Sequence, residues 1–278
     1  MKKIAFALFM ALVGQTLSAQ SSRFIYEVSM KPNASDKSEV KTELAYLDVG
    51  PKKSVYYGEN RFKRDSIMQR MRETRNFDRS QTETLQSNID YIIEKDFAEQ
   101  QVTYKGRIGR DQYEYVEDRK MNWKILPETV RIGDYKTQKA ETDFGGRKWT
   151  AWFTSDLPFQ EGPYKFSGLP GLIVTLEDAD GDYGFNLKEV KKISEPASFD
   201  ARGTTVKLKR TEYEKQWERF SKDPVSFMRS QMSSGRAGGP GQGQSGNRGG
   251  FQPDPQRMKQ MENRLKETLS KSSNSIEK

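Results

Sequence analysis

Large apolar and polar residues alternate along the first part of the chain with a period of two. Between residues 24 and 30 every second side chain is large and apolar, namely Phe24, Tyr26, Val28 and Met30. This period predicts a strand with one buried face, because successive side chains of a strand point to opposite faces of a sheet. Similar short segments recur up to residue 209, with turns between them such as Gly50-Pro51 and Gly145-Gly146. Short strands at this spacing are typical of an antiparallel sheet.

The same pattern sets the fold class over most of the chain. We expect strands near residues 24–30, 41–46, 54–57, 91–93, 101–105, 112–116, 123–126, 135–140, 148–153, 172–176, 189–193 and 204–209. Turns are expected at Pro127-Glu128 and Asp180-Gly181. Helical spacing of apolar residues is seen within 59–87, 212–220 and 255–271, and Asp223-Pro224 predicts the start of a short helix. The prediction is a mainly β protein of the α+β type, with a curved antiparallel sheet or half-barrel covered by helices.

Residues 1–20 have the order of charges and apolar residues of a secretory signal peptide. Lys2 and Lys3 precede the apolar run 4–13, and small residues follow near 18–20. The run is too short to span a bilayer as a stable helix. No later stretch is long and apolar enough either, so we expect no transmembrane segment. The chain is therefore predicted to be exported, and to be periplasmic or associated with the outer membrane.

The remainder divides into four predicted parts by composition. Residues 21–210 hold the β-rich domain and 211–232 a helical extension. Residues 233–254 are expected to form a flexible linker, because eight of the 21 residues from 233 to 253 are glycine. Residues 255–278 are expected to form an amphipathic helix and a tail, with an apolar stripe of Met258, Met261, Leu265 and Leu269. This helix either docks back on the body or binds a partner.

The absence of cysteine and histidine limits the chemistry of the chain. Catalysis by Ser-His-Asp or Cys-His groups is excluded, and the usual ligands of zinc, copper and haem are missing. No cofactor is predicted. The net charge is +8, and residues 201–278 account for all of it with 16 Lys and Arg against 8 Asp and Glu. Such a basic segment suits anionic headgroups, lipopolysaccharide or an acidic partner. Nucleic acid is not expected, because no motif for it is present.

One acidic loop has the spacing of a calcium-binding loop. Asp178, Asp180 and Asp182 alternate, and Glu189 is twelfth when Asp178 is counted as first. However, Tyr183 stands at the sixth position, where that loop needs glycine for its sharp turn. Asp180-Gly181 is a better signal for a two-residue hairpin turn. We therefore predict a hairpin here and no metal site.

The segment KAETDFGGRKWTAWFTSDLPFQEGPYKFSGLPGLI, residues 139–173, resembles a known family. Its last six residues match the motif that names the GLPGLI family, secreted proteins of Bacteroidota with no established function. The motif residues are Gly168, Leu169, Pro170, Gly171, Leu172 and Ile173. The resemblance implies an uncharacterised exported protein and supplies no catalytic residue. Pro170 and the two glycines predict a sharp corner that leads into a strand. Such a corner serves either packing or the binding of a ligand or partner.

An aromatic and basic patch precedes this corner. The candidate binding residues are Arg147, Trp149, Trp152, Tyr164, Lys165 and Phe166. The aromatic rings either pack in the core or line a cavity. The cations, together with Lys148, either meet an anionic group or are exposed and only aid solubility.

Three functions are compatible with these observations. The first is a non-catalytic envelope protein that binds an apolar ligand, a peptide or an outer-membrane partner; its architecture resembles the half-barrel of periplasmic lipoprotein carriers, which is analogy only. The second is a hydrolase that uses paired carboxylates, for which Asp143, Asp156 and Glu161 are candidates near the aromatic patch. The third is a surface or matrix component. We favour the first.

Overall fold

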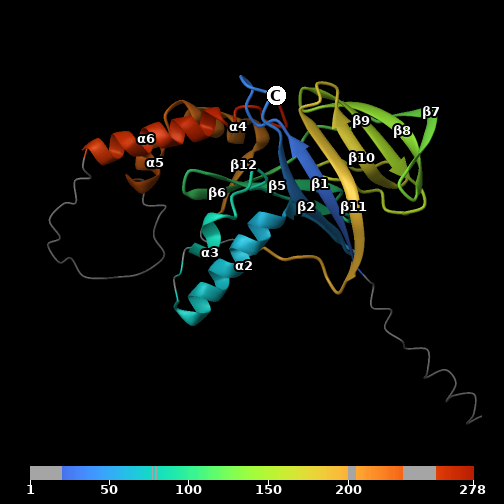
Figure 1. Cartoon of the computed structure of the whole chain (residues 1–278), viewed down its shortest axis with the longest axis horizontal. Coiled ribbons are helices and arrows are strands. Elements are labelled where there is room, and N and C mark those ends of the chain that lie inside the picture. The colour runs from blue at the N-terminus through green and yellow to red at the C-terminus, as the bar shows by residue number, and fades with distance from the viewer. Residues whose placement is uncertain (1–20, 77, 79, 200–204, 234–254) are drawn as a thin grey trace, which may run out of the picture.

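The structure is a computed structural model that describes residues 21–76, 78, 80–199, 205–233 and 255–278 (Figure 1). The predicted signal peptide, residues 1–20, and almost all of the predicted linker, residues 234–254, lie outside the described residues. The first described strand begins at Ser21, directly after the predicted signal peptide.

In the described residues, twelve strands form one open sheet in the order β12-β6-β5-β4-β3-β2-β1-β11-β10-β9-β8-β7. The strands are β1 Ser21–Met30, β2 Lys41–Val49, β3 Lys53–Gly58, β4 Ile92–Asp96, β5 Gln101–Ile108, β6 Asp111–Val116, β7 Lys124–Ile132, β8 Tyr135–Phe144, β9 Arg147–Thr154, β10 Leu172–Asp178, β11 Tyr183–Ile193 and β12 Thr205–Lys209. Neighbours pair antiparallel except β12, which runs parallel to β6. The predicted mainly β fold is confirmed, but the sheet is mixed and not purely antiparallel.

The described helices lie outside the sheet. They are α2 Glu59–Thr74, α3 Ser80–Glu83, α4 Arg210–Lys222, α5 Pro224–Ser233 and α6 Pro255–Ser270. The predicted start of α5 is confirmed, because the N–H of Ser226 donates to the carboxylate of Asp223 at 3.0 Å. Among the described residues, none of these helices combines the length and the apolar character that crossing a bilayer requires.

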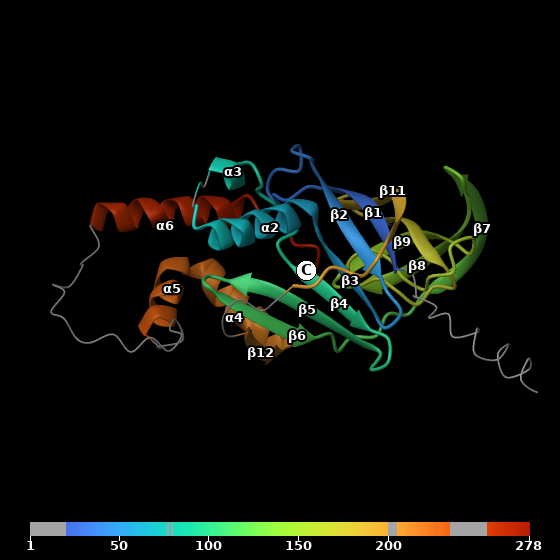
Figure 2. The ribbon, with the colours of Figure 1, turned by 90° about the horizontal axis from the view of Figure 1, so that it is seen from below.

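Three apolar clusters hold the layers together. The largest fills the inner face of the curved sheet with residues that include Phe24, Tyr26, Leu47, Trp149 and Phe166. A second lies under α2 on the opposite face, where Val55, Tyr57 and Ile92 meet Phe62. The third joins β5 and β6 to α4 and α5 through Ile108, Tyr113, Phe220 and Phe227. Figures 1 and 2 show the sheet bending between β1 and β7, with α4, α5 and α6 gathered at its other end.

The C-terminal helix docks back on the body, which was one of the two outcomes left open by the sequence. Leu269 of α6 packs against the third cluster. Two ion pairs one turn apart lie along α6, with Lys266 bonded to Glu262 at 2.6 Å and Lys271 to Glu267 at 2.7 Å. The chain after α6 then returns to the sheet, and Figure 1 shows the C-terminus at one end of the strands.

Two predicted turns differ in the structure. Pro127 and Glu128 lie inside β7, at an irregularity in its pairing with β8 between Ile125 and Thr129. An edge strand tolerates proline at a bulge, because the missing N–H is not needed by a neighbour. The loop at Asp180-Gly181 contains four residues, 179–182, and not two.

The GLPGLI segment forms the expected sharp corner before β10. Leu169, Leu172 and Ile173 are buried in the main core, whereas Pro170 is exposed. Gly171 has a φ of 154°, and a Cβ at this residue would lie 2.0 Å from the carbonyl oxygen of Thr154. The backbone of the corner is therefore pressed against the end of β9 in a way that only glycine permits.

A buried ion pair fixes the loop that precedes the corner. The ammonium of Lys95 in β4 donates to Glu161 at 2.8 Å and to the carbonyl oxygens of Gly162 and Phe166 at 3.1 and 2.7 Å. Both charged side chains are almost fully buried. Burial lowers the pKa of Lys95, and the nearby carboxylate of Glu161 opposes that shift. Lys95 thereby holds the chain on both sides of Tyr164 and Lys165.

We predict that Gly171→Ala destabilises the protein by about 3 kcal/mol or more, because the new methyl group would meet backbone that cannot move away. Gly133→Ala is the matched control: Gly133 also has a positive φ, 56°, but no atom lies within 4 Å of a Cβ placed there. It should cost about 1 kcal/mol. Urea unfolding measures both, and equal losses would contradict this account of the corner.

Candidate functional site

Residues 273–278, here called the tail segment, lie against the inner side of the sheet. The N–H of Asn274 donates to the carbonyl of Pro32 at 2.8 Å, and the N–H of Lys278 donates to the carbonyl of Gly145 at 2.7 Å. Between them the side chain of Ile276 joins the main core. The segment is thus bound through its backbone at two points and through an apolar side chain.

Lys165 and Arg119 bind the carboxylate of Glu277. The ammonium of Lys165 donates to Glu277 at 2.6 Å and to Glu117 at 2.7 Å. The guanidinium of Arg119 donates to the same two carboxylates, at 2.7 Å to Glu277 and 2.8 Å to Glu117. The hydroxyl of Tyr164 donates to Glu277 at 2.6 Å. Two cations therefore face two carboxylates, and one of these carboxylates comes from the tail segment.

The pKa values around Lys165 follow from this arrangement. Burial alone would raise the pKa of Glu117, but the hydrogen bond and charge of Arg119 and the charge of Lys165 lower it to about 2. Glu277 also has a lowered pKa, because Lys165 and Arg119 outweigh its burial. Burial raises the pKa of Tyr164 well above its ordinary value, so its hydroxyl remains protonated and donates.

Tyr164 has a strained backbone. Its φ is 54°, in the left-handed region that a bulky side chain rarely adopts. The hydrogen bonds of Lys95 to the neighbouring residues hold this conformation. Strain of this kind costs on the order of 1–3 kcal/mol and is often found where a residue serves a binding site. Here it accompanies a phenol and an ammonium that both reach Glu277.

Arg147 binds the other part of the tail segment. One guanidinium nitrogen donates to the side-chain oxygen of Asn274 at 2.6 Å and to the carbonyl of Ser275 at 2.8 Å. The other donates to Asp178 at 2.6 Å and to Asp182 at 3.1 Å. The hydroxyl of Tyr183 donates to the carbonyl of Asn274 at 2.6 Å. Arg147 therefore links the acidic loop to the tail segment.

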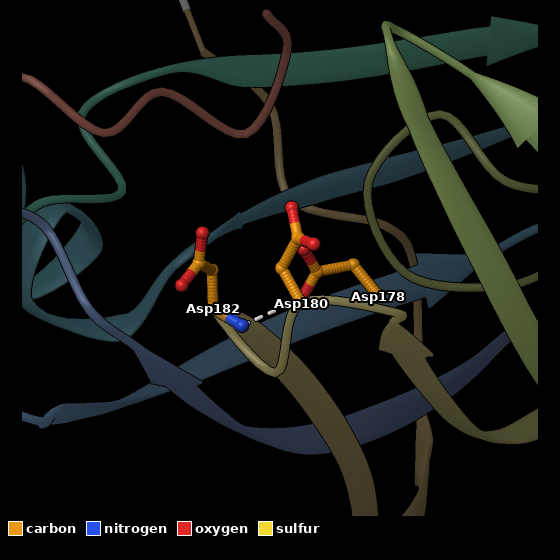
Figure 3. Close-up of side chains that lie close together, drawn as sticks. All are labelled: Asp178, Asp180 and Asp182. Atoms are coloured by element: carbon orange, nitrogen blue, oxygen red, sulfur yellow. Dashed lines mark hydrogen bonds between the residues drawn. The ribbon is translucent and has the colours of Figure 1, made fainter. Parts of the chain in front are cut away.

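The acidic loop is neutralised by side chains of the protein. Figure 3 shows Asp178, Asp180 and Asp182 at the turn between β10 and β11, with the N–H of Asp182 bonded to Asp178 at 2.7 Å. Arg147 reaches the first and last of these carboxylates, Lys37 pairs with Asp182 at 2.9 Å, and Lys278 pairs with Asp180 at 2.6 Å. Three cations thus meet three carboxylates.

The pKa of Asp182 reflects these cations. Burial would raise it, but hydrogen bonds from Lys37, Asn274 and Arg147 lower it to about 2. Glu189, the fourth residue of the calcium-like spacing, lies apart on β11 and pairs with Lys191 at 2.9 Å.

The structure brings together only some of the predicted binding residues. Arg147, Tyr164 and Lys165 contact the tail segment directly. Trp149 and Phe166 lie in the core, with ring centroids 4.8 Å apart. Trp152 is half-buried on the opposite face of β9. Arg147 and Lys165 are both about 1 % exposed at their side chains, so of the two alternatives left open by the sequence, an exposed charge that only aids solubility does not apply to them.

Several residues of this site carried no sequence signal. Glu117 and Arg119 follow β6 and come close only because β6 lies near the loop after β9. Asn274 and Glu277 belong to a short polar stretch with no periodicity. We call Arg119, Gly145, Arg147, Tyr164 and Lys165 the tail seat, since these residues bind the tail segment.

The carboxylates proposed for a hydrolase serve other roles or lie at the surface. Glu161 is buried and accepts hydrogen bonds from Lys95 and from the hydroxyl of Ser54 at 3.0 Å. Asp143 and Asp156 are exposed. The carboxylate pair that the site does contain is Glu117 and Glu277, and both are held by Lys165 and Arg119.

Comparison with known proteins gives a short match to one family model and a likeness of fold. A family model described as a protein of unknown function (Porph_ging) matches residues 141–175, from the end of β8 into β10. No curated protein matches the chain. A crystal structure of PNGF-II in space group P21 is similar at a TM-score of 0.52 and 15 % identity, over 72 % of this chain and 34 % of that one. A second, in space group C2, gives 0.49 and 16 %, over 71 % and 32 %.

The chain therefore spans about a third of the length of PNGF-II, and the first likeness shows a shared fold only. The family match covers a short part of the chain, but that part includes Gly145, Arg147, Tyr164 and Lys165 of the tail seat.

We predict that Glu277→Gln lowers the free energy of unfolding near neutral pH by about 1–3 kcal/mol, because Lys165 and Arg119 lose a charged partner. The folded pKa of Glu277 is below its ordinary value of 4.5, so its stabilisation is present above that pH and is lost as the pH falls through the folded pKa. The melting temperatures of the two proteins should therefore converge as the pH approaches 2.

The matched control is Glu267→Gln on α6, which removes an exposed pair with Lys271. It should change stability by no more than about 0.5 kcal/mol. A constant difference between wild type and Glu277→Gln from pH 7 to pH 2 would show that the charge of Glu277 does not matter.

Proposed function

We propose that this chain is an exported, non-catalytic envelope protein that binds an extended peptide segment in the tail seat. The observation that carries the proposal is the seating of residues 273–278, which the sheet holds through backbone hydrogen bonds, an apolar contact and a bound carboxylate. The sequence suggested an apolar ligand, a peptide or an outer-membrane partner. We favour the peptide, because a peptide segment of the chain itself already fills the seat.

The shape of the seat supports peptide binding. Gly145 and Gly146 both have a positive φ, and the turn they form faces the tail segment. A Cβ at Gly145 would lie 2.9 Å from the Cγ of Glu277, and one at Gly146 would lie 3.0 Å from the Cβ of Lys278. Backbone donors and acceptors give such sites affinity for an extended chain, while the pockets for side chains give specificity.

Export is the second part of the proposal. The charged, apolar and small-residue order of residues 1–20 supports it, and β1 begins at Ser21. We predict that the protein purified from its own cells starts within two residues of Ser21. Intact-mass measurement checks this, and a chain that retains residues 1–20 in the envelope fraction would contradict signal cleavage.

To test peptide binding, a site for a specific protease is placed between residues 240 and 250 of the full chain. After folding and cleavage, only non-covalent contacts hold residues 255–278 on the body. We predict that a fluorescent synthetic peptide of residues 255–278 exchanges with the resident segment. Its dissociation constant should be in the micromolar range, which corresponds to a binding free energy on the order of −8 kcal/mol. Fluorescence anisotropy measures the binding.

The control peptide has the same composition, with the order of residues 273–278 scrambled, and it should bind at least tenfold more weakly. The proposal fails if the labelled peptide is not taken up while circular dichroism shows that the cleaved protein keeps its fold. In that case the tail segment is a permanent part of the core.

A further inference from the structure

We infer that the tail seat selects peptides with the pattern Asn-x-apolar-acidic, followed by a basic residue. The inference rests on the proposed peptide binding and adds the chemical class of the ligand. Each position of the pattern corresponds to a distinct group of contacts in the structure, and these contacts differ in depth and charge.

The asparagine position is read by three groups. Arg147 donates to the side-chain oxygen of Asn274, and the side-chain NH₂ of Asn274 donates to the carbonyl of Lys31 at 2.7 Å. Tyr183 donates to its backbone carbonyl. Asn274 is 7 % exposed, so a side chain without both a donor and an acceptor would leave buried polar groups unpaired.

The apolar position is read by the main core. Ile276 is 8 % exposed and belongs to the same cluster as Trp149 and Phe166. A polar side chain here would lose its water without gaining a partner. The pattern therefore requires an aliphatic residue two positions after the asparagine.

The acidic position is read by a local excess of positive charge. Without the tail segment, Glu117 is the only carboxylate that pairs with Lys165 and Arg119 among the residues that the structure describes. Arg210, the next cation, lies 3.7 Å from Glu117 and is itself paired with the exposed carboxylates of Asp118 and Glu214. A carboxylate from the ligand restores the balance around the buried ammonium of Lys165, and Tyr164 adds a hydrogen bond that only an acceptor can use.

The basic position contacts the acidic loop, and this contact is weaker than the one at the acidic position. Arg147 and Lys37 bind Asp178 and Asp182 closely, and Asp180 pairs with Lys278 at 2.6 Å while Arg147 lies farther from it, at 3.9 Å. Asp180 and Lys278 are both about half exposed, so water and salt screen their attraction. We therefore expect the acidic position to contribute much more to selectivity than the basic one.

The test uses the cleaved full chain and a panel of synthetic peptides of residues 255–278, compared by competition with the labelled parent. Asn274→Ala, Ile276→Ser and Glu277→Gln should each bind about 10- to 100-fold more weakly. Exchanging the order of Glu277 and Lys278 should weaken binding at least as much as Glu277→Gln. Lys278→Gln should weaken it by about two- to fivefold.

A charge exchange at the surface gives an independent check. Asp180→Lys in the body changes an exposed residue of a turn, so the fold should tolerate it. This variant should bind the Lys278→Glu peptide about two- to fivefold better than the parent peptide, which reverses the preference of the unmodified body.

The outcomes separate the two proposals. If no peptide binds, including the parent, the proposed function is wrong, and so is the inferred pattern. If the parent and all variants bind equally, the seat binds peptides without this selectivity, so the pattern is wrong while the proposed function stands. The inference is supported if the substitutions of Asn274, Ile276 and Glu277 each lower the affinity. It also requires that the preferred charge at residue 278 of the peptide reverses when the charge at residue 180 of the body is reversed.

Discussion

Two buried cations, Arg147 and Lys165, determine how the rest of the site is arranged. An ammonium or guanidinium removed from water is destabilising unless carboxylates and hydrogen-bond acceptors surround it. The sheet supplies Asp178 and Asp182 for Arg147 and Glu117 for Lys165. Lys165 also donates to the hydroxyl of Tyr115 at 2.8 Å, and further acceptors come from residues 274, 275 and 277. The tail segment is therefore required by the charges beneath it, and the end of the chain is placed by electrostatics as much as by the packing of Ile276.

The geometry of the corner before β10 has a direct connection to these cations. Gly171 brings the GLPGLI backbone against the end of β9, and Lys95 bonds to the loop on both sides of Tyr164. Together they force Tyr164 into the left-handed region and direct Lys165 toward Glu117. The corner and the tail seat are thus one mechanical unit. Of the alternatives that the sequence left open for the corner, packing is observed, because Leu169, Leu172 and Ile173 are buried in the main core.

The sequence predicted the strands well and the site only in part. Period-two alternation located nearly all strands, because most of them bury one face. It missed the parallel pairing of β12 with β6, since local patterns carry no information about which distant strand is a neighbour. The sequence indicated Arg147 and Lys165 as candidate binding residues but could not decide whether they are buried, because charged residues beside strands are usually exposed. The role of residues 274–277 depends on contacts with residues 91 to 243 positions earlier, and no local signal reveals those.

An occupant that belongs to the same chain changes how a site of this kind responds to other ligands. A covalent link keeps a segment at an effective concentration in the millimolar range. A tail segment with a micromolar intrinsic dissociation constant would then fill the seat roughly 99.9 % of the time. A free peptide with the same contacts would compete only at concentrations near millimolar. A partner that docks elsewhere on the protein has no such disadvantage, because its own peptide would also be held close to the seat. Under the proposed peptide binding, the seat would therefore favour a peptide presented by a bound partner over the same peptide free in solution.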